Sequence, residues 1–416
     1  MDERAWQKIY DSIGSVPKNP VIVGFNVNLD RIITVTPELL NSELLNQPSL
    51  LELRTRLLHS MRTCTAEEWF VSDPKLYQQF CHAFVQTGML VIGGQAGISA
   101  VYLASTGISD VLCLTHSPGS GTRRLLDRAG VRVQDLSELE KNPSYMIHLI
   151  FEYPPGLVPL AEGATPRNNR FIVSPVHLPE SVLIPDEKVG PVLAATYPYA
   201  RAFLSGYQYL HTESDFARAG DQILQMKKNN GRMRIHVECV SVTDPEVISG
   251  FICHILPAAD SVGLNEHELQ LLLKNMNREN PNPGTFEELS PVRQVNGALG
   301  ICTTCGLKRL HLHTFGYYIQ VTRTDCACPE ASINALLFAS LNVAESAQGT
   351  RREISSRGIS AYDEVNSALG PHISPGIFRS GNFTIFLIPT IIAENISKSS
   401  GLGDVLSSSA FVADRF

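Results

Sequence analysis

The chain has 416 residues, of which 44% are hydrophobic, and its formal net charge at pH 7 is −7. This composition is typical of a soluble globular protein with a large core, and we expect one large domain together with a smaller one. The acidic balance does not favour nucleic acid or an anionic membrane as a partner, so we expect a small-molecule site in which any phosphate is bound locally.

The sequence contains neither a membrane span nor an export signal. No apolar run reaches the roughly 18 residues that cross a bilayer, and the charged start MDERAWQKIYDSIG lacks the apolar core of a signal peptide. The nine cysteines are an odd number scattered along a long chain, which favours reduced thiols over a disulfide framework. We therefore expect a cytoplasmic protein, either a monomer or a small homo-oligomer.

Short apolar runs rich in β-formers alternate with helical patterns along the chain. In order, the runs are NPVIVGF, DVLCLTH, RAFLSGY, MRIHVEC, DSVGLN, LHLHTF and FTIFLIP. Helices are predicted over 213–231, where Gly231 is the stop signal, and over 266–276. This alternation predicts an α/β fold whose mostly parallel central sheet is covered by helices on both faces.

Three segments depart from this pattern because they alternate without a clear following helix. They are RIITVTPELL, YMIHLIFEYPPG and NRFIVSPV, and they predict a separate small sheet that we interpret as a lid. No Gly/Ser linker separates them, so we expect the lid to be inserted into the large domain. The predicted lid comprises 31–70 and 141–179, and the large domain comprises 1–30, 71–140 and 180–416.

Polar residues follow several of the predicted strands. They are Asn26, Asn28, Asp30, Glu238, Asn265, Glu266 and Glu268. In open α/β sheets ligands bind beyond the carboxyl ends of the strands, and carboxylates from two strands can hold Mg²⁺ directly or through its waters. Each acid alone is more typical of a solvated loop or a helix cap than of a metal site, but their recurrence at strand ends reduces that preference.

Two cysteine pairs, Cys302 with Cys305 and Cys326 with Cys328, could supply four thiolates to zinc. The periodicity around the first pair instead predicts a helix that ends at Gly306, so we interpret these cysteines as helix-packing residues. His311 and His313 share one face of a predicted strand, and we interpret them as core or supporting residues rather than metal ligands.

The Gly-x-Gly-Asp sequence at 401–404 precedes a helical pattern near the end of the chain. Consecutive N–H groups in such a turn can bind an anion, and the helix dipole strengthens that binding. Asp404 would then accept a proton from an attacking hydroxyl, while the amides of Leu402 and Gly403 offset developing charge. The alternative is that Asp404 only caps the helix, where Asp is also favoured.

Taken together, these features resemble the ADP-dependent glucokinase and phosphofructokinase family of the ribokinase-like superfamily. The matching stretches are GFNVNLD, MRTCTAEEWF, GGQAGI, HLIFEYPPG, PRNNRFI, LSGYQ, HVE, SVGLNEHEL, HLHTFGYY and GLGD. They extend in order over nearly the whole chain, and GGQAGI, NRFI and HTFGYY together indicate the ADP-using branch. The chain departs from the family pattern before the final turn, where KSS replaces a threonine and an apolar residue, and at Val405.

The resemblance implies a ribokinase-like fold and transfer of the β-phosphate of Mg-ADP to a sugar hydroxyl, which leaves AMP. Asp404 would be the general base, and Gly401, Leu402 and Gly403 the anion hole. The sugar-contacting positions would be Asn28, Asp30, Glu68, Gly94, Gln95 and His148. Glu238 and Glu268 would serve the magnesium ion, and Arg170, Asn265 and Tyr317 the nucleotide, with Tyr317 near adenine.

The resemblance also bears on the sugar. Glu68 matches a glutamate of the glucose-using members, and YPPGLVPLAEGAT contains Glu162 but no cation for a sugar phosphate. We therefore predict glucose as the substrate, while Arg167 and Lys188 leave fructose 6-phosphate, or both sugars, as the alternative.

Two further alternatives remain open at the level of sequence. The fold could serve a sugar- or nucleotide-binding protein without turnover, although the presence of Asp404, Glu238 and Glu268 argues against this. The spacing of residues does not separate ADP from ATP as the donor. A Walker-type NTPase is disfavoured because the chain has no G-x-x-x-x-G-K-[ST] sequence.

Overall fold

The computed structural model covers the whole chain. The residues that it describes are 1–14, 16–64, 67–116, 118–137, 147–157, 164–166, 168–176, 181–240, 242, 244–277, 288–347, 349, 351–370, 372–394 and 401–416. Within these ranges, no helix combines the length and the apolar character needed to cross a membrane.

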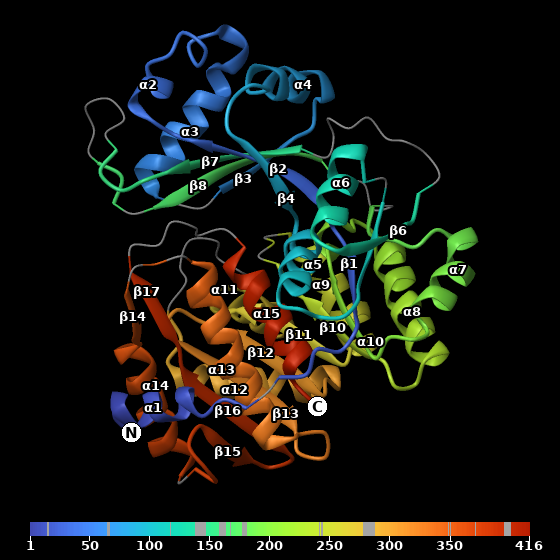
Figure 1. Ribbon diagram of the computed structural model, residues 1–416, viewed down its shortest axis with the longest axis vertical. Coiled ribbons are helices and arrows are strands. Elements are labelled where there is room, and N and C mark those ends of the chain that lie inside the picture. Colours follow the sequence, from blue (N-terminus) through green and yellow to red (C-terminus); the bar gives the residue numbers. More distant parts are fainter. Residues whose placement is uncertain are drawn as a thin grey trace.

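A large, mostly parallel sheet forms the centre of the molecule (Figure 1). Among the described residues its strands are, in spatial order, β15 (Ile377–Ser380), β16 (Phe383–Pro389), β13 (Tyr317–Arg323), β12 (Arg309–His313), β11 (Ser261–Asn265), β10 (Arg234–Glu238), β9 (Arg201–Ser205), β1 (Val21–Phe25), β5 (Val111–Thr115) and β6 (Val131–Asp135). The strands from β12 to β6 are parallel, and β13, β16 and β15 continue the sheet in antiparallel pairs. Strands such as VIVGF are buried throughout, as expected for a sheet that is covered on both faces.

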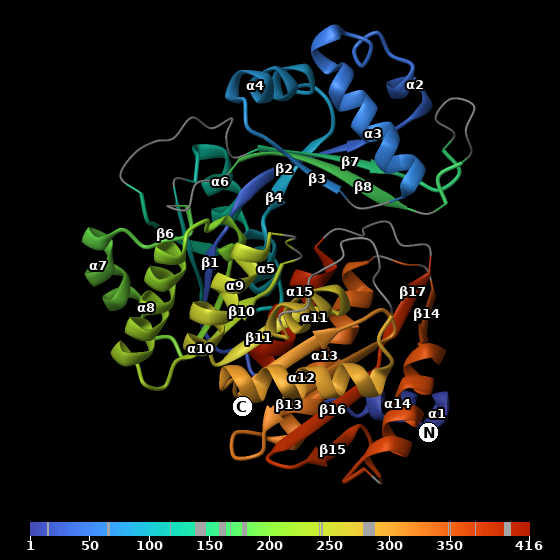
Figure 2. The same ribbon diagram turned by 180° about the vertical axis from the view of Figure 1, so that it is seen from behind.

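Helices cover both faces of this sheet, as Figures 1 and 2 show from opposite sides. One face carries α5 (Gln95–Ser105) and α15 (Leu402–Ala413), and α13 (Pro329–Ser346) packs along α15. The remaining helices of this part are α1 (Glu3–Asp11), α6 (Ser120–Arg128), α7 (Asp186–Thr196), α8 (Glu213–Asn229), α9 (Pro245–Gly250), a π-helix (Phe251–Ile255), α10 (Leu256–Ala258), α11 (Glu266–Met276), α12 (Pro291–Cys305) and α14 (Ser356–Leu369). The predicted fold class is therefore confirmed.

Local signals account for several helix ends. The helix α11 has the predicted bounds, whereas α8 ends two residues before Gly231, with Asn230 as its C-cap. Gly306, which adopts a left-handed φ of +69°, ends α12 as predicted.

A smaller sheet lies at one end of the molecule, beside the carboxyl edge of the large sheet (Figures 1 and 2). Its strands are, in spatial order, β3 (Glu67–Val71), β8 (Asn169–Pro175), β7 (Ile147–Tyr153), β2 (Asn28–Thr34) and β4 (Met89–Gly93). It has its own apolar core with α2 (Pro37–Leu40), α3 (Leu51–Thr63) and α4 (Pro74–Ala83). Only Asn26 and Val27 separate β1 from β2, so the carboxyl end of β1 faces this sheet.

The smaller sheet includes more of the chain than the sequence predicted. We expected 71–140 in the large domain, but β4 pairs in antiparallel register with β2, and α4 packs on β3 and β8. The prediction for 71–93 is corrected on this point. Strand pairing between distant segments decides which sheet contains β4, and no local sequence pattern predicts that pairing.

Three further elements complete the list: 3₁₀ helices at Pro48–Leu50 and Tyr207–Tyr209, and a two-stranded sheet of β14 (Arg351–Ile354) and β17 (Ile391–Glu394).

Candidate active site

The first polar group of the site lies where β2 and β4 meet the start of α5. The Asn28 Nδ2 donates to Asp30 Oδ1 at 2.6 Å. A Cβ at Gly93 would lie 2.0 Å from Asp30 Oδ1, and Gly94 has a φ of +75° with its Cα packed near Asn28 Oδ1. The two glycines of GGQAGI therefore let the backbone approach this amide and this carboxylate closely.

Asp30 and Glu68 come from different strands of the smaller sheet, and their charges interact. Burial and then repulsion from Glu68 raise the pKa of Asp30 to about 7, while Arg170 and the hydrogen bond from Asn28 oppose that shift. Burial raises the pKa of Glu68, whose Oε1 accepts from Ser174 Oγ at 2.5 Å. Two carboxylates thus share one region with a single guanidinium, that of Arg170 on β8.

Two further predicted sugar-contacting residues lie beside this group. His148 is buried on β7 and is paired in register with Asp30 on β2. Gln95 is the first residue of α5, and its buried Oε1 has no hydrogen-bond partner among the described residues. A buried acceptor without a donor costs free energy, so a ligand hydroxyl at this position would be stabilising.

The turn at 401–404 forms the N-terminus of α15, on the other side of the same cleft. Gly401 is the N-cap with a left-handed φ of +74°, and no side chain caps the helix among the described residues. The Val405 N–H bonds to the Gly401 carbonyl, so the N–H groups that precede it in the first turn are open to an anion. Asp404 is not the N-cap but lies in the first turn, which distinguishes its position from that of a simple cap.

Asp404 lies between the carboxylates of the two sheets. Burial raises its pKa to about 7, and Arg170 acts in the opposite direction. Its charge in turn raises the pKa of Asp30 in the smaller sheet and that of Glu238 in the large sheet. The Ser408 Oγ donates to the Asp404 carbonyl at 2.6 Å and supports this turn of the helix.

Glu238 ends β10 and is held by two buried partners. Its Oε1 accepts from Ser407 Oγ at 2.9 Å, and its Oε2 lies 2.9 Å from His236 Nε2. Burial lowers the pKa of His236 well below its ordinary value, so the ring is neutral and Nε2–H donates to the carboxylate. A Cβ at Gly263 would lie 2.3 Å from Glu238 Oε2, so this glycine leaves room for the acid.

Asn265 and Glu268 form the capping box of α11. The Asn265 Oδ1 accepts from the N–H groups of His267 and Glu268, and Glu268 Oε2 accepts from the Asn265 N–H at 2.8 Å. The Asn-x-x-Glu sequence therefore has a local structural role as the cap of this helix.

Oxygen atoms of these acids border a small cavity, and oxygen is the ligand that Mg²⁺ prefers. Glu238, Glu268 and Gln208 line a cavity of about 30 Å³, and Gln208 Oε1 has no hydrogen-bond partner in the described part of the chain. Burial, followed by repulsion from Glu268 and Asp404, raises the pKa of Glu238 well above its ordinary value, and a cation would relieve that repulsion. The described residues contain no cluster of three or more metal-binding side chains.

A pocket of about 280 Å³ lies beside Leu402 and Gly403 and has aromatic walls. His313, Phe315 and Tyr318 line it, and Phe315 is 66% exposed. Tyr317 does not line this pocket: it is buried, and its hydroxyl donates to Gln294 Oε1 at 3.1 Å. Neighbouring residues of a strand face opposite sides, so in HTFGYY the second tyrosine, not the first, faces the pocket.

The other residues discussed in the sequence are placed as follows. His311 is fully buried beside His313, in agreement with a core position, and Cys302 is buried on α12. Cys326 and Cys328 lie between β13 and α13 as free thiols. Lys188 lies on α7, while Glu162 and Arg167 lie outside the described residues.

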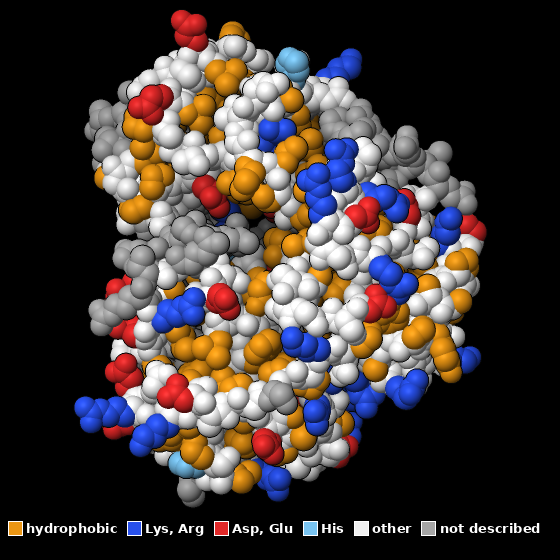
Figure 3. Space-filling model, in the orientation of Figure 1, with side chains coloured by type: hydrophobic (Ala, Val, Ile, Leu, Met, Phe, Trp, Pro, Cys, Tyr) orange, Lys and Arg blue, Asp and Glu red, His pale blue; other side chains and the backbone are white. Residues whose placement is uncertain are grey.

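The space between the two sheets is open on one side of the molecule. A cavity of about 620 Å³ is lined by Asp30 from the smaller sheet and by Ile98 and Val405 from α5 and α15. Figure 3 shows this face hollowed between the upper and lower parts, with hydrophobic side chains around the hollow. A substrate of sugar size can therefore reach the carboxylates from solvent.

Comparisons with known proteins show the family of the chain. Residues 19–413 match the model of the ADP-specific phosphofructokinase/glucokinase conserved region. The ADP-dependent glucose/glucosamine kinase of Pyrococcus furiosus is 25% identical, with 98% of each chain covered. The ADP-specific phosphofructokinase of Pyrococcus abyssi is 26% identical, with 96% of this chain and 98% of the relative covered.

Solved structures share the fold. The last common ancestor of ADP-dependent phosphofructokinases from Methanosarcinales superposes with a TM-score of 0.77 and 23% identity, over 99% of this chain and 98% of the other. An ADP-dependent kinase in complex with fructose 6-phosphate and ADPβS superposes with a TM-score of 0.77 and 24% identity, over 99% of this chain and 96% of the other. The chain therefore belongs to the ADP-specific phosphofructokinase/glucokinase family, and it is an enzyme, an ADP-dependent sugar kinase.

Proposed function

We propose that the protein transfers the β-phosphate of Mg-ADP to glucose and forms glucose 6-phosphate and AMP. The observation that carries this proposal is the pair of carboxylates, Asp30 and Glu68, whose charges interact at the sugar side of the cleft. Carboxylates only accept hydrogen bonds when ionised, so they suit a neutral sugar whose hydroxyl groups donate. A sugar phosphate would be repelled by both, with Arg170 as the cation in their midst.

The proposed chemistry follows from the position of Asp404. The sugar hydroxyl gives its proton to the Asp404 carboxylate as its oxygen bonds to the β-phosphorus, and the bond from that phosphorus to the bridging oxygen breaks to release AMP. A carboxylate with a pKa of about 7 is well matched to this task at neutral pH. The open N–H groups of Leu402 and Gly403 would hold the transferring phosphoryl group, and Gly401 makes the turn that directs them.

The remaining proposed contacts concern the donor. Arg170 would pair with the phosphates, and the aromatic pocket with Tyr318 would take adenine, in place of Tyr317. Glu238 and Glu268 would hold Mg²⁺ through its waters, and Asn265 would place Glu268 beside the nucleotide. The metal ion would neutralise phosphate charge as it develops during transfer.

Fructose 6-phosphate is the second candidate substrate, alone or together with glucose. It is favoured by the similarity to ADP-specific phosphofructokinases, such as that of Pyrococcus abyssi at 26% identity. The residues that would decide between the sugars include 158–163 and 167, which lie outside the described residues.

The smaller sheet would act as a lid with either sugar. It would close on the sugar and exclude water that would hydrolyse the donor.

A coupled assay that crosses ADP and ATP with glucose and fructose 6-phosphate tests the proposal. We expect the highest kcat/KM for the pair of ADP and glucose, with one AMP formed for each glucose 6-phosphate. A higher kcat/KM with fructose 6-phosphate would replace glucose by the alternative sugar. Binding of both substrates without AMP formation would instead identify a non-catalytic binding protein.

A further inference from the structure

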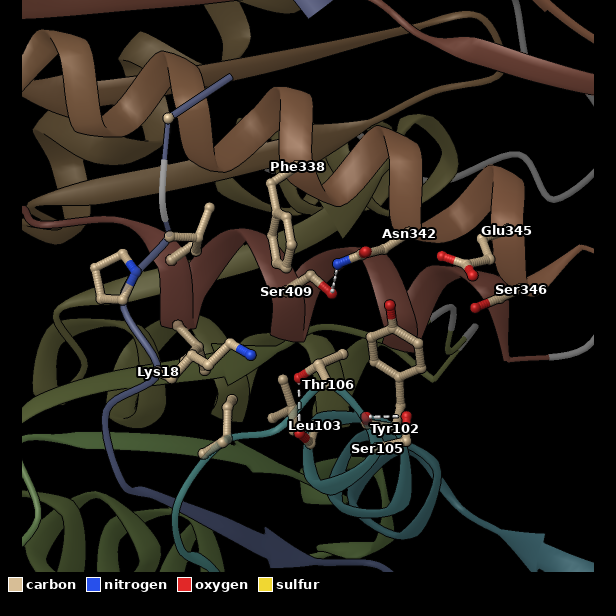
Figure 4. Close-up of a pocket in the computed structure, with 16 residues that line it drawn as sticks. Lys18, Tyr102, Leu103, Ser105, Thr106, Phe338, Asn342, Glu345, Ser346 and Ser409 are labelled. Atoms are coloured by element: carbon tan, nitrogen blue, oxygen red, sulfur yellow. Dashed lines mark hydrogen bonds between the residues drawn. The ribbon is translucent and has the colours of Figure 1, made fainter. Parts of the chain in front are cut away.

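A second cavity lies between α5, α13, α15 and the segment that follows α1, and it adjoins the cavity beside Asp30 at Tyr102 and Ser105. It has a volume of about 620 Å³, which is in the range of small-molecule sites. Figure 4 shows its walls: Lys18 reaches in from the N-terminal segment, Tyr102 rises from α5, and Phe338, Asn342 and Glu345 descend from α13. None of the residues proposed for sugar, nucleotide or metal lines this cavity.

Polar groups are distributed in this cavity in a way that selects a ligand. Asn342 and Ser409 are buried in its floor, where Asn342 Nδ2 donates to Ser409 Oγ at 3.3 Å and Ser409 forms a hydrogen bond with Tyr102. At the rim, Lys18 and Glu345 lie on opposite sides in Figure 4. Neither has an ion-pair partner in the described part of the chain.

The donor and acceptor properties of the two charged groups define the two ends of the ligand. Lys18 only donates, so the ligand end beside it must carry an acceptor, and its positive charge favours an anion. Glu345 only accepts when ionised, so the ligand end beside it must carry hydroxyl or amine hydrogens. The ring of Phe338 and the side chain of Leu103 supply an apolar wall for the carbon skeleton between them.

The C-terminal end of α5 borders this cavity, and the charge of Lys18 offsets the partial negative charge of that helix end. The C-terminal carbonyls of α5 at Tyr102, Leu103 and Ala104 are occupied by the N–H groups of Thr106 and Gly107. The hydroxyls of Ser105 and Thr106 also donate to two of them. The Lys18 Nζ lies next to this end of α5, within 3.0 Å of where a Cβ of Gly107 would be.

We propose that this cavity is a second binding site, and that its ligand is a small hydroxylated organic phosphate. The phosphate would lie at Lys18 and the hydroxyl groups at Glu345, with Asn342 and Ser409 beneath the skeleton. The site touches the later turns of α5 and α15, whose first turns carry Gln95 and Asp404. A ligand in this cavity therefore contacts both helices that begin at the candidate active site.

Calorimetric titration with ribose 5-phosphate, ribose and inorganic phosphate tests the proposal. We expect Lys18→Ala to weaken binding of ribose 5-phosphate and of phosphate by roughly tenfold or more, because a charge-assisted contact is lost. Glu345→Gln should weaken binding of ribose 5-phosphate and of ribose but leave phosphate unchanged. Lys8→Ala, which removes an exposed lysine of α1 outside the cavity, is the matched control and should change nothing.

Two results would overturn the second site. One is absence of ribose 5-phosphate binding to the wild-type protein at millimolar concentration. The other is a loss of binding in Arg170→Ala together with unchanged binding in Lys18→Ala, since that would place the ligand in the candidate active site. Phosphoryl transfer measured without the probe should be unchanged in Lys18→Ala, so the outcome is independent of the proposed sugar substrate.

Discussion

At the scale of single residues, the charges that interact in the cleft include the carboxylates of Asp30, Glu68 and Asp404 and the guanidinium of Arg170. Burial raises the pKa of Asp30, Glu68 and Asp404, and Arg170 lowers all three. A carboxyl group that titrates near neutral pH can take a proton from a hydroxyl and release it again within one catalytic cycle. Arg170 therefore adjusts the basicity of Asp404.

Asp404→Asn should reduce kcat by roughly 10²- to 10⁴-fold, because the amide has the shape of the carboxylate but cannot accept the proton. Nucleotide affinity should be nearly unchanged, since the N–H groups of α15 remain in place. Steady-state kinetics and equilibrium binding of ADP would measure both quantities. Asp127→Asn, at an exposed position of α6, is the control. Turnover near that of the wild type in Asp404→Asn would exclude Asp404 as the base.

Glu68→Ala should separate the two candidate sugars. Glucose hydroxyls would lose an acceptor in a buried site, which costs roughly 1–3 kcal/mol, or about one to two decades in kcat/KM. Activity with fructose 6-phosphate should hold or improve, because a negative charge is removed. Measurement of kcat/KM for both sugars at saturating Mg-ADP gives the answer. Ser174→Ala, which removes only the donor to Glu68, is the companion variant. Equal losses of kcat/KM for both sugars in Glu68→Ala would indicate a structural role for Glu68.

At the scale of elements, the N-terminus of α11 combines a structural task with a proposed chemical one. Glu268 Oε2 caps the Asn265 N–H, and the Glu268 side chain lines a small cavity together with Glu238. Gln is also a favoured partner in a capping box. The change Glu268→Gln can therefore remove the charge while keeping the helix end.

Glu268→Gln and Glu238→Gln should each raise the Mg²⁺ concentration required for half-maximal activity. The Tm of Glu268→Gln should change little. The reason is that an amide oxygen holds the waters of a divalent cation less strongly than a carboxylate does. Titration of Mg²⁺ at fixed ADP would measure the effect, and Glu266→Gln on the same turn is the matched control. Unchanged magnesium dependence in both variants would leave the two acids as structural residues.

At the scale of the whole molecule, the buried carboxyls should make stability depend on pH. Folding raises the pKa of Asp30 and Asp404 from about 4 to about 7, so between these values the folded protein holds protons that the unfolded chain has released. Their contribution to the free energy of unfolding therefore falls as pH rises through this window, and their ionisation remains costly above about pH 7. The site is destabilising at the pH where it works.

Asp30→Asn and Asp404→Asn should accordingly have a higher Tm than the wild type at pH 8, because the buried negative charge is gone. Each unit of raised pKa corresponds to about 1.4 kcal/mol. Near pH 4 the difference should vanish, since the wild-type carboxyls are then protonated as well. Calorimetric scans at both pH values would test this, and a lower Tm in both variants at pH 8 would contradict it.

Closure of the smaller sheet on the large one is the motion that the architecture favours. The short connection through Asn26 and Val27 joins β1 to β2, and the cavity beside Asp30 of the smaller sheet is also lined by Val405 of α15. We expect the radius of gyration from small-angle scattering to decrease when glucose and Mg-ADP bind together to Asp404→Asn, which holds both without turnover. The protein with each ligand alone is the control. A radius that does not change with both ligands would argue against closure.

The sequence by itself determined the local structure and the family. Continuous apolar runs predicted the buried parallel strands, and the capping sequence at Asn265 gave α11 its bounds, because strand burial and helix capping depend on neighbouring residues. The Gly-x-Gly-Asp turn was likewise evident from its residue types. These are features in which a short stretch of chain contains the whole physical cause.

Only the tertiary structure decided how distant segments meet. It assigned β4 to the smaller sheet through its pairing with β2, and it turned Tyr318 rather than Tyr317 toward the pocket beside Gly403. It also brought Asp30 and Asp404 close enough for the charge of one to raise the pKa of the other. Strand pairing, strand facing and charge interaction act between residues that are far apart in the chain, so no local pattern encodes them.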